Sequence, residues 1–293
     1  MHTLELPFGW LFFLSFKSRF YFISNDQLTF IHDMLSEPAF QFTLSPGQKI
    51  YFASDFHLGA PDHAQSRERE NIIIRWLNQV QADAHTIFLL GDIFDFWFEY
   101  KYVVPKGYIR ILGKLASLRD NGTKIILFTG NHDMWMFDYL QHELDVPIVR
   151  NPVSIRINEQ DLHVGHGDGL GSGDRQFKML KKVFTSRLSQ KLFAAVHPRW
   201  GMGLAHFWSQ HSRKKNATKD ESFKGKEYEW IYEYCEDLEK RYHHDYYIFG
   251  HRHLPLDIPI NENSRYFNIG EWIQAKTYGV HDGQQFTLSH FEG

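Results

Sequence analysis

Five short segments of the chain carry side chains that bind hard or borderline metal ions. In chain order they are Asp55-Phe56-His57, Gly91-Asp92, Gly130-Asn131-His132-Asp133, Gly165-His166-Gly167-Asp168 and Gly250-His251-Arg252-His253. Carboxylate and carbonyl oxygens suit Mn²⁺ and Mg²⁺, and neutral imidazole suits manganese, iron, zinc and nickel. A lone histidine is usually a surface or core residue, but five such segments in one chain favour a phosphoesterase that uses two metal ions.

The elements that precede these segments must position them. Lys49–Ser54, Thr86–Leu90 and Lys124–Phe128 are short apolar runs that predict buried strands, and each leads into one of the segments. Between them, Ser66–Gln81 and Lys106–Arg119 are predicted to be helices. This alternation predicts a parallel sheet covered by helices. Open sheets of this kind bind ligands at the carboxyl ends of their strands, where the first three segments lie.

The second half of the chain has a different pattern. Ser154–Ile157 and Asp161–Val164 predict a hairpin whose second strand leads into the fourth segment. Lys224–His243 predicts a further helix, and Asp245–Phe249 predicts a strand that leads into the fifth segment. Residues 255–290 are expected to complete the β-structure.

The spacing within the segments supports a metal site. Asp55 and His57 are two residues apart, and in a regular strand such side chains point to the same side. His251 and His253 share this spacing. Asp92 follows a glycine, which permits the tight backbone turn that a bridging ligand needs.

Composition narrows the class of protein. The chain has 293 residues, of which 43% are hydrophobic, so it can bury a sizeable core. Its net charge of -3 gives no overall attraction to nucleic acid. Cys235 is the one cysteine, which excludes an internal disulfide framework and a thiolate metal cage. We expect it to be an inert packing residue on a helix.

The amino-terminal region gives the weakest indication of structure or targeting. Phe8–Phe16 is apolar but too short to span a bilayer, and it lacks the basic flank and cleavage site of a signal peptide. Met34 is a candidate start of the protein, and a disordered or loosely docked tail is the alternative. We expect residues 1–48 to form an extension and residues 49–293 to form one catalytic domain.

Residues 174–219 are predicted to form a helical cap inserted after the fourth segment. From 178 onwards the insertion is both cationic and rich in bulky apolar residues. An amphipathic helical pair packed on the core would explain this pattern, as would a lid with cations for a diphosphate and a groove for acyl chains. An exposed surface of this kind also favours an anionic membrane interface. A nucleic-acid groove is the rival use of the charge, but the many aliphatic residues suit acyl chains better than base stacking.

The order of the five segments resembles that of the calcineurin-like metallophosphoesterases. This resemblance implies an α/β fold in which a sandwich of two mixed sheets is flanked by helices. It also implies two bound metal ions that share one bridging carboxylate. By position, one ion would take Asp55, His57, Asp92 and His253, and the other would take Asp92, Asn131, His166 and His251.

Residues 49–293 also resemble a narrower family, the UDP-2,3-diacylglucosamine pyrophosphatases of the lipid A pathway. The matching segments are SDFHLG (54–59), GDIFDFW (91–97), TGNHDMW (129–135), GHGDGLGSGD (165–174), the insertion over 192–219 and GHRHLP (250–255). The resemblance implies hydrolysis of an acylated UDP-sugar to 2,3-diacylglucosamine 1-phosphate and UMP. It implies Mn²⁺ as the metal, although the ligand types alone also allow iron, zinc or magnesium.

The same resemblance implies where the substrate binds and where the protein works. It implies a cytoplasmic protein held at the inner face of the inner membrane, with no nucleic-acid partner; the sequence gives no oligomeric state. The implied substrate contacts are Asn131, His132, Asp174, Ser212, Asn216, Lys219 and His251.

His132 is where this chain departs from many members of the narrower family, which have arginine there. The chain keeps the GNHD form of the wider family. Asp95 is three residues after Asp92 and is predicted to hydrogen-bond to His132, which would orient the imidazole and raise its pKa, as suits a general acid. Asn131 would stabilise negative charge that develops on the phosphate.

Two other functions stay open on the sequence alone. One is a phosphodiesterase or phosphatase that acts on a soluble nucleotide or another phosphoester. The other, from a different class, is a non-catalytic binding protein on a degenerate esterase scaffold, although all seven expected ligands are present. A substrate panel separates the first from the lipid hydrolase, and metal content with turnover tests the second.

Overall fold

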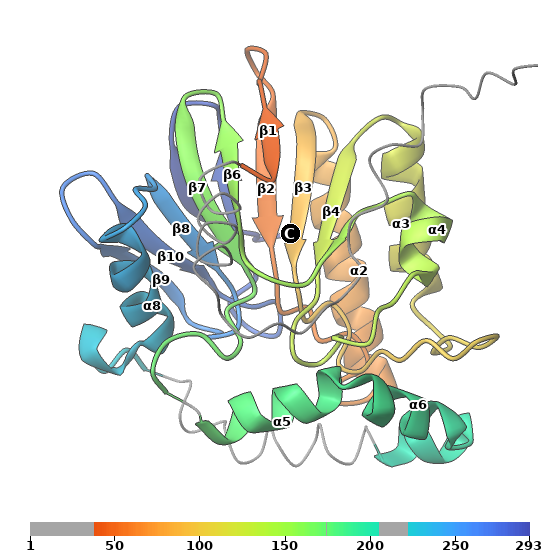
Figure 1. The fold of residues 1–293 in the computed structure, drawn as a ribbon. Helices are drawn as coiled ribbons and strands as arrows, with labels where there is room; N and C mark the ends of the chain where they lie inside the picture. The colour runs from red at the N-terminus through yellow and green to blue at the C-terminus, as the bar shows by residue number, and fades with distance from the viewer. Residues whose placement is uncertain (1–37, 174, 205–221) are drawn as a thin grey trace, which may run out of the picture.

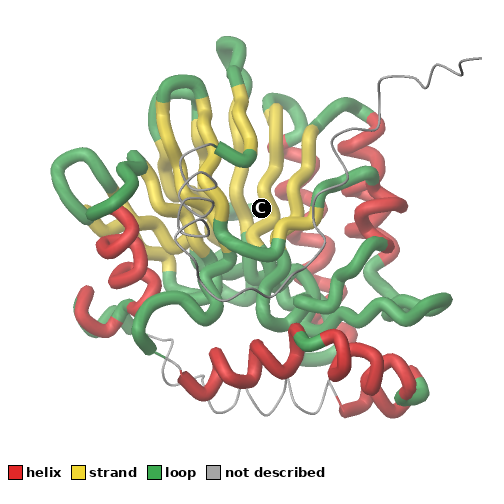
Figure 2. Tube along the Cα trace, viewed as in Figure 1, coloured by secondary structure: helices red, strands yellow, loops and turns green. Residues whose placement is uncertain are grey.

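Two six-stranded sheets form the centre of the structure, a computed structural model that describes residues 38–173, 175–204 and 222–293. The first sheet has the strand order β12-β11-β2-β3-β4-β5, and the second has the order β1-β6-β7-β8-β10-β9. Both sheets are mixed, and helices lie outside them (Figures 1 and 2). The α/β sandwich expected from the sequence is therefore confirmed.

The first sheet contains the three strands that the sequence predicts to be parallel. These are β2 (Lys49–Ala53), β3 (Ala84–Leu90) and β4 (Lys124–Phe128), and each pairs in parallel with the next. Their outer face is covered by α2 (His63–Val80) and α3 (Ile109–Asp120). Because the three strands run the same way, their carboxyl ends meet at one edge.

Three shorter additions complete the first sheet. A two-residue strand, β5, pairs in parallel with β4 after the helix α4 (Tyr139–Leu144). On the opposite side, β11 runs antiparallel to β2, and the last strand, β12, runs antiparallel to β11. The added strands are β5 (Ile148–Val149), β11 (Thr277–His281) and β12 (Phe286–His290).

The second sheet is built around the predicted hairpin, which is confirmed as an antiparallel pair. Its second strand pairs in parallel with β8, so these two strands also end at the same edge. The strands are β6 (Val153–Ile157), β7 (Gln160–Gly165), β8 (Tyr246–Phe249), β9 (Pro255–Pro259) and β10 (Arg265–Ile269).

Two elements differ from the sequence prediction. A three-residue strand, β1 (Phe40–Phe42), pairs with β6 inside the segment expected to be an extension, and three residues are too few to show a periodic pattern. The helix predicted over Lys224–His243 is shorter, with a 3-10 turn, η1 (Lys226–Tyr228), before α8 (Trp230–Glu239). Met34 lies outside the described residues, six positions before β1.

Alternation along the strands divides the core into layers. In β2, Ile50 and Phe52 belong to the apolar cluster between the two sheets, whereas Tyr51 and Ala53 belong to the cluster beneath α2 and α3. A third cluster joins α8 to the outer face of the second sheet and includes the fully buried Cys235. Every strand that leads into a site segment is thus packed on both faces.

The predicted cap begins with two helices after β7. They are α5 (Arg175–Thr185) and α6 (Arg187–Ala195), and a further helical stretch reaches residue 204. In Figure 1 they lie below the edge where β2, β3 and β4 end. The rest of the expected insertion lies outside the described residues.

Candidate metal centre

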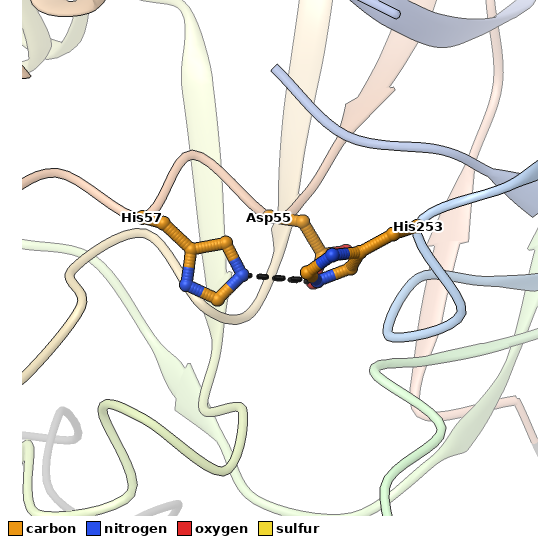
Figure 3. A group of neighbouring side chains, drawn as sticks. All are labelled: Asp55, His57 and His253. Atoms are coloured by element: carbon orange, nitrogen blue, oxygen red, sulfur yellow. Dashed lines mark hydrogen bonds and ion pairs between the residues drawn. The ribbon is translucent and has the colours of Figure 1, made fainter. Parts of the chain in front are cut away.

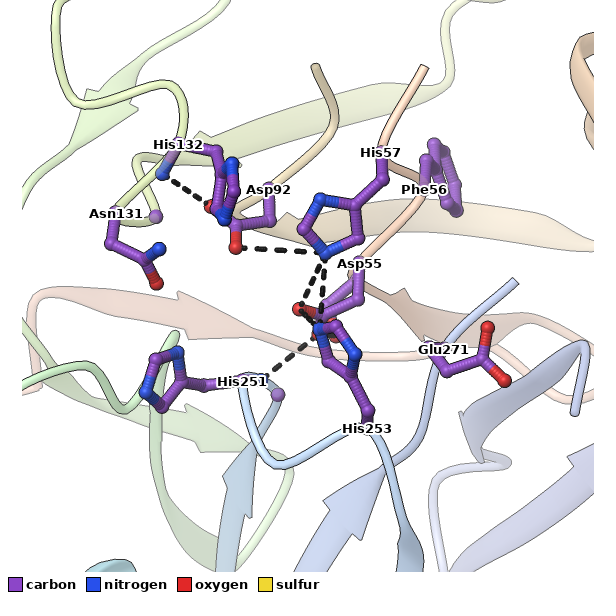
Figure 4. Close-up of polar contacts among 12 residues, drawn as sticks. Asp55, Phe56, His57, Asp92, Asn131, His132, His251, His253 and Glu271 are labelled. Carbon is purple, nitrogen blue, oxygen red and sulfur yellow. Dashed lines mark hydrogen bonds and ion pairs between the residues drawn. The ribbon is translucent and has the colours of Figure 1, made fainter. Parts of the chain in front are cut away.

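The five predicted segments converge at the carboxyl ends of β2, β3, β4, β7 and β8, and Figure 4 labels residues from four of them. Their side chains form three overlapping groups, and within each group the ligand atoms lie within 4.8 Å of one another. Asp55, His57, Asp92 and His166 are buried, and the other three side chains are half-buried. The groups are Asp55 with His57 and His253, Asp92 with His166 and His251, and His57 with Asp92 and His132.

The first group places three ligand atoms around one point (Figure 3). His57 Nε2 lies 3.0 Å from His253 Nε2, and Asp55 Oδ1 lies 3.1 Å from His253 Nε2. Among the described residues no donor hydrogen-bonds to Asp55 Oδ1, although the atom is buried. Buried carboxylate oxygens normally have a partner, so an oxygen left facing two imidazole nitrogens fits a metal ion.

The second group contains a histidine whose tautomer is fixed. His166 Nδ1 lies 2.8 Å from the Leu90 carbonyl oxygen, which can only accept, so the proton is on Nδ1. Nε2 then faces Asn131 Oδ1, 3.3 Å away, and Asp92 Oδ2, 3.4 Å away. A backbone carbonyl that orients a ligating imidazole in this way is typical of metal sites.

Asp92 lies between the two groups. Its Oδ2 is 3.4 Å from His166 Nε2 and 3.7 Å from His57 Nε2. Its Oδ1 accepts a hydrogen bond of 2.8 Å from the backbone N–H of His132, which prevents the carboxylate from rotating. This is the arrangement that a carboxylate shared by two ions requires.

The backbone of the site is not that of a regular strand. Five proposed ligands have positive φ angles, in the left-handed region that residues other than glycine rarely adopt. The same-side argument for Asp55 and His57, and for His251 and His253, is therefore wrong, because these residues lie past the strand ends. Each such residue costs roughly 1–3 kcal/mol unless its surroundings impose it. The φ angles are 56° for Asp55, 43° for His57, 52° for Asp92, 69° for His251 and 58° for His253.

Two buried charged residues hold these turns, and the sequence analysis gave neither a role. Arg69, on the buried face of α2, donates to the carbonyl oxygens of Phe56 at 2.7 Å and His57 at 2.6 Å. Asp133 accepts from the N–H groups of Ile93 at 2.8 Å and Gly130 at 2.7 Å. The role of Arg69 could have been found from the sequence. It lies four residues before Ile73 on the apolar face of a predicted helix, and an arginine in such a place needs a buried partner.

The charges in the centre are complementary. Burial opposes the charged form of His57, but the carboxylates of Asp55 and Asp95 raise its pKa to about 10. Burial likewise opposes the charged form of His166, but Asp92 raises its pKa to about 10. For Asp92 itself, burial is outweighed by nearby histidines, so that its pKa is lowered. Carboxylates that stay ionised in a dry site need positive charge beside them, and divalent cations supply it.

His132 departs from the expectation for a general acid. Its Nδ1 lies 2.9 Å from the carbonyl oxygen of Asp95 and 3.7 Å from the carboxylate Oδ1, so the hydrogen bond goes to the backbone. Asp95 and Asp92 do raise the pKa of His132, but burial is the larger effect and lowers it. The prediction of a raised pKa is therefore wrong. The ring is held with Nδ1–H donating, which leaves the Nε2 lone pair available.

The described part of the cap is fastened at both ends. In α5, Lys181 Nζ lies 2.6 Å from Asp168 Oδ2, and the Phe177 ring centroid is 6.4 Å from that of His251. In α6, the Phe193 ring packs on aromatic residues of the core, with a centroid distance of 4.8 Å to Trp135. The cap therefore adjoins the metal centre at one end and an aromatic cluster at the other.

An apolar hollow lies on the cap, beside Trp135 of the core. It has a volume of about 300 Å³ and is lined mainly by apolar side chains of α5, α6 and the loop after β4. Beyond the hollow, the cap exposes further apolar residues. The hollow is lined by Trp135, Val183, Phe184, Ser189, Leu192, Phe193 and Val196, and the further exposed residues are Met179, Leu188, Trp200 and Leu204.

The structure describes three of the seven expected substrate contacts. Asn131, His132 and His251 lie in the metal centre. The other four expected contacts, Asp174, Ser212, Asn216 and Lys219, lie outside the described residues.

Comparison with known proteins gives a family match and named relatives. Residues 48–255 match the calcineurin-like phosphoesterase family. The UDP-2,3-diacylglucosamine hydrolase of Porphyromonas gingivalis is 37% identical over 256 residues, which cover 83% of this chain and 98% of the relative. The protein of the same name from Edwardsiella ictaluri is 26% identical over 204 residues, or 70% of this chain and 75% of the relative.

The chain also has a structural likeness among solved proteins. A Vps29 structure from Entamoeba histolytica with bound zinc covers 82% of this chain and 90% of its own, with 11% identity and a TM-score of 0.39. Within the described ranges, every helix is too short or too polar to cross a bilayer.

Proposed function

Because this chain belongs to the calcineurin-like phosphoesterase family, we propose that it hydrolyses the pyrophosphate bond of UDP-2,3-diacylglucosamine, giving 2,3-diacylglucosamine 1-phosphate and UMP. The observation that carries the proposal is the position of Asp92 between two groups of candidate metal ligands. The name of the Porphyromonas gingivalis relative supports this choice of substrate.

The chain's own residues would hold two ions, for which Mn²⁺ is our proposal. Asp55, His57, Asp92 and His253 would hold one, and Asp92, Asn131, His166 and His251 would hold the other. When bound, such ions lower the pKa of water and stabilise charge on phosphoryl oxygens. The buried Asp55 Oδ1, which lacks a hydrogen-bond donor among the described residues, and the orientation of the His166 ring by the Leu90 carbonyl support this assignment.

The residues around the ions would position the diphosphate. Asn131 lies on the side of His166, where its amide can face a phosphoryl oxygen. His132 presents Nε2 beside Asp92, so that it would orient the leaving group or a water through a hydrogen bond. Burial of these groups excludes bulk water and strengthens each interaction.

The cap would bind the lipid part of the substrate. Its hollow is apolar and opens beside exposed aliphatic residues, which suits acyl chains. We place Asp174, Ser212, Asn216 and Lys219 at the sugar and phosphate. The exposed apolar side chains and the lysines of α5 and α6 would also hold the protein at an anionic membrane surface on the cytoplasmic side.

Turnover with matched substrates tests the proposal. The purified protein with Mn²⁺ should release UMP from the diacylated UDP-sugar with a far higher kcat/KM than from the same UDP-sugar without acyl chains. Each buried methylene contributes about 0.8 kcal/mol, so four of them give roughly a hundredfold difference. Equal kcat/KM values for the two substrates, or faster cleavage of a cyclic nucleotide, would favour the soluble-nucleotide phosphodiesterase instead.

A further inference from the structure

Arg252 stands between two proposed ligands, yet its side chain contacts a carboxylate that belongs to neither group. Its Nε lies 3.0 and 3.2 Å from the two carboxylate oxygens of Glu229, and Nη2 donates to the carbonyl oxygen of Ser222 at 3.2 Å. Glu229 is only 3% exposed, and the Arg252 side chain is 17% exposed. A charge pair this deep must be made between well-placed groups, because an unpaired partner would be left without solvent.

The backbone on both sides of Arg252 needs such a restraint. His251 and His253 both have left-handed φ angles, 69° and 58°, so this turn is held against its local preference. Its first part is tied by the backbone N–H of His251 to Asp55 Oδ2 at 2.9 Å, and by the Asn268 amide to the carbonyl oxygen of Gly250. The contacts of the Arg252 side chain with Glu229 and Ser222 restrain the middle of the turn, between the two histidines.

Glu229 is on a rigid support. It is the residue before α8, and the first turns of that helix bury Ile231 and Tyr232 against the second sheet. The Ile231 side chain also lies against Gly167, the residue after the ligand His166. The carboxylate of Glu229 therefore has a fixed position relative to two of the five ligand segments.

We propose that Glu229 is a positioning residue of the metal centre, which through Arg252 fixes the turn that directs His251 and His253 to different ions. The inference rests on the proposed two-ion centre but not on the identity of the substrate. Loss of a residue that orients metal ligands typically costs about 10- to 100-fold in metal affinity. Because Glu229 touches no reacting atom, its loss should raise the Mn²⁺ concentration needed for activity and affect kcat at saturating Mn²⁺ much less.

The experiment is a Mn²⁺ titration of the full chain, followed by the electron paramagnetic resonance signal of free Mn²⁺. Glu229→Gln keeps the size of the side chain and removes its charge. It should weaken Mn²⁺ binding about 10- to 100-fold and shift the Mn²⁺ activation curve for a small chromogenic phosphodiester equally. Glu229→Asp should recover part of the affinity, because it restores the carboxylate.

A matched control is Asp161→Asn, which removes the carboxylate of a bidentate pair with Arg156, both contacts 2.7 Å, on the β6–β7 hairpin. Its Mn²⁺ curves should match those of the unmodified chain. If Glu229→Gln does not fold, Arg252→Lys keeps the cation, loses the planar fork and should show the same shift. Unchanged Mn²⁺ affinity in a folded variant, even one of lowered stability, would overturn the proposal.

The outcome is separable from that of the proposed function. If the unmodified chain binds two Mn²⁺ ions but does not cleave the acylated UDP-sugar, the proposed substrate is wrong and the Mn²⁺ titrations still decide the role of Glu229. A chain that binds no divalent ion would overturn both proposals.

Discussion

The metal centre and the cap are built in opposite ways. The centre is made of buried side chains on strained turns, and each turn is tied by charged groups such as Arg69, Asp133 and Glu229. The cap helix α6 buries none of its residues fully, and the cap exposes many apolar side chains. The difference is that the sequence of the centre fixes a geometry, whereas the described part of the cap presents an apolar surface.

The first prediction tests the centre at its shared residue. Asp92→Ala should abolish turnover and lose at least one bound ion, because Asp92 Oδ2 is the carboxylate oxygen that lies near ligands of both groups. Metal content and turnover of the purified variant check this. Asp161→Asn serves as the control for loss of a carboxylate elsewhere. Two bound ions with full activity in Asp92→Ala would contradict the two-ion assignment.

The second prediction concerns His132, in the centre but outside the proposed ligand set. His132→Ala should leave both ions bound and lower turnover, since positioned acid–base groups contribute about 10²- to 10⁴-fold. Two substrates whose leaving groups differ widely in pKa distinguish its roles. A smaller loss on the better leaving group would support an acid role, and an equal loss would leave His132 as a residue that positions the substrate. His132→Arg tests whether a cation alone suffices.

The third prediction tests the independence of the cap. Phe193→Ala removes the ring that packs on Trp135 and Phe98, at centroid distances of 4.8 and 4.7 Å. Phe193 is half-buried, so its truncation should cost less than the roughly 3–5 kcal/mol lost with a fully buried phenylalanine, but it removes aromatic contacts that hold α6 on the core. We expect kcat/KM for the acylated UDP-sugar to fall by at least about tenfold, while that for a small phosphodiester stays near its original value. Ala194→Ser, an exposed change on the same helix, is the control. Equal losses on both substrates would show that the cap also organises the centre.

The sequence predicted the parts of the molecule that depend on contiguous patterns. Apolar runs such as Lys124–Phe128 gave the strands, and the polar residues after them gave the centre, because neighbouring parallel strands end together. The left-handed turns, the arginine ties and the pKa of His132 depend on contacts between distant residues and on burial, which local patterns do not show. At the start of α8, for example, Glu229 pairs with Arg252, which is 23 positions away in the sequence.

The last prediction concerns the core, where acid should lower the free energy of unfolding through a buried histidine. His163 is fully buried in the second sheet, where burial, with a smaller effect of His244, lowers its pKa to about 3. In the unfolded chain a histidine has a pKa of about 6.5. The unfolded chain therefore binds more protons between these values, so the stabilising contribution is complete above pH 6.5 and is lost as the pH falls toward 3, by up to about 1.4 kcal/mol per pH unit.

Urea unfolding at pH 7.5 and pH 5.5 measures this loss. A chelator is included so that bound metal ions do not add to the stability at either pH. His163→Gln, which does not titrate, should lose less free energy of unfolding between the two pH values than the unmodified chain, by roughly 1 kcal/mol. His63→Gln replaces an exposed histidine at the start of α2 and should leave the difference unchanged. An unchanged pH dependence in a folded His163→Gln variant would mean that His163 is protonated in the native state, against its burial beside Ser154 and Tyr234. Because α6 buries none of its residues, the cap variant Phe193→Ala should keep the full acid sensitivity of the unmodified chain.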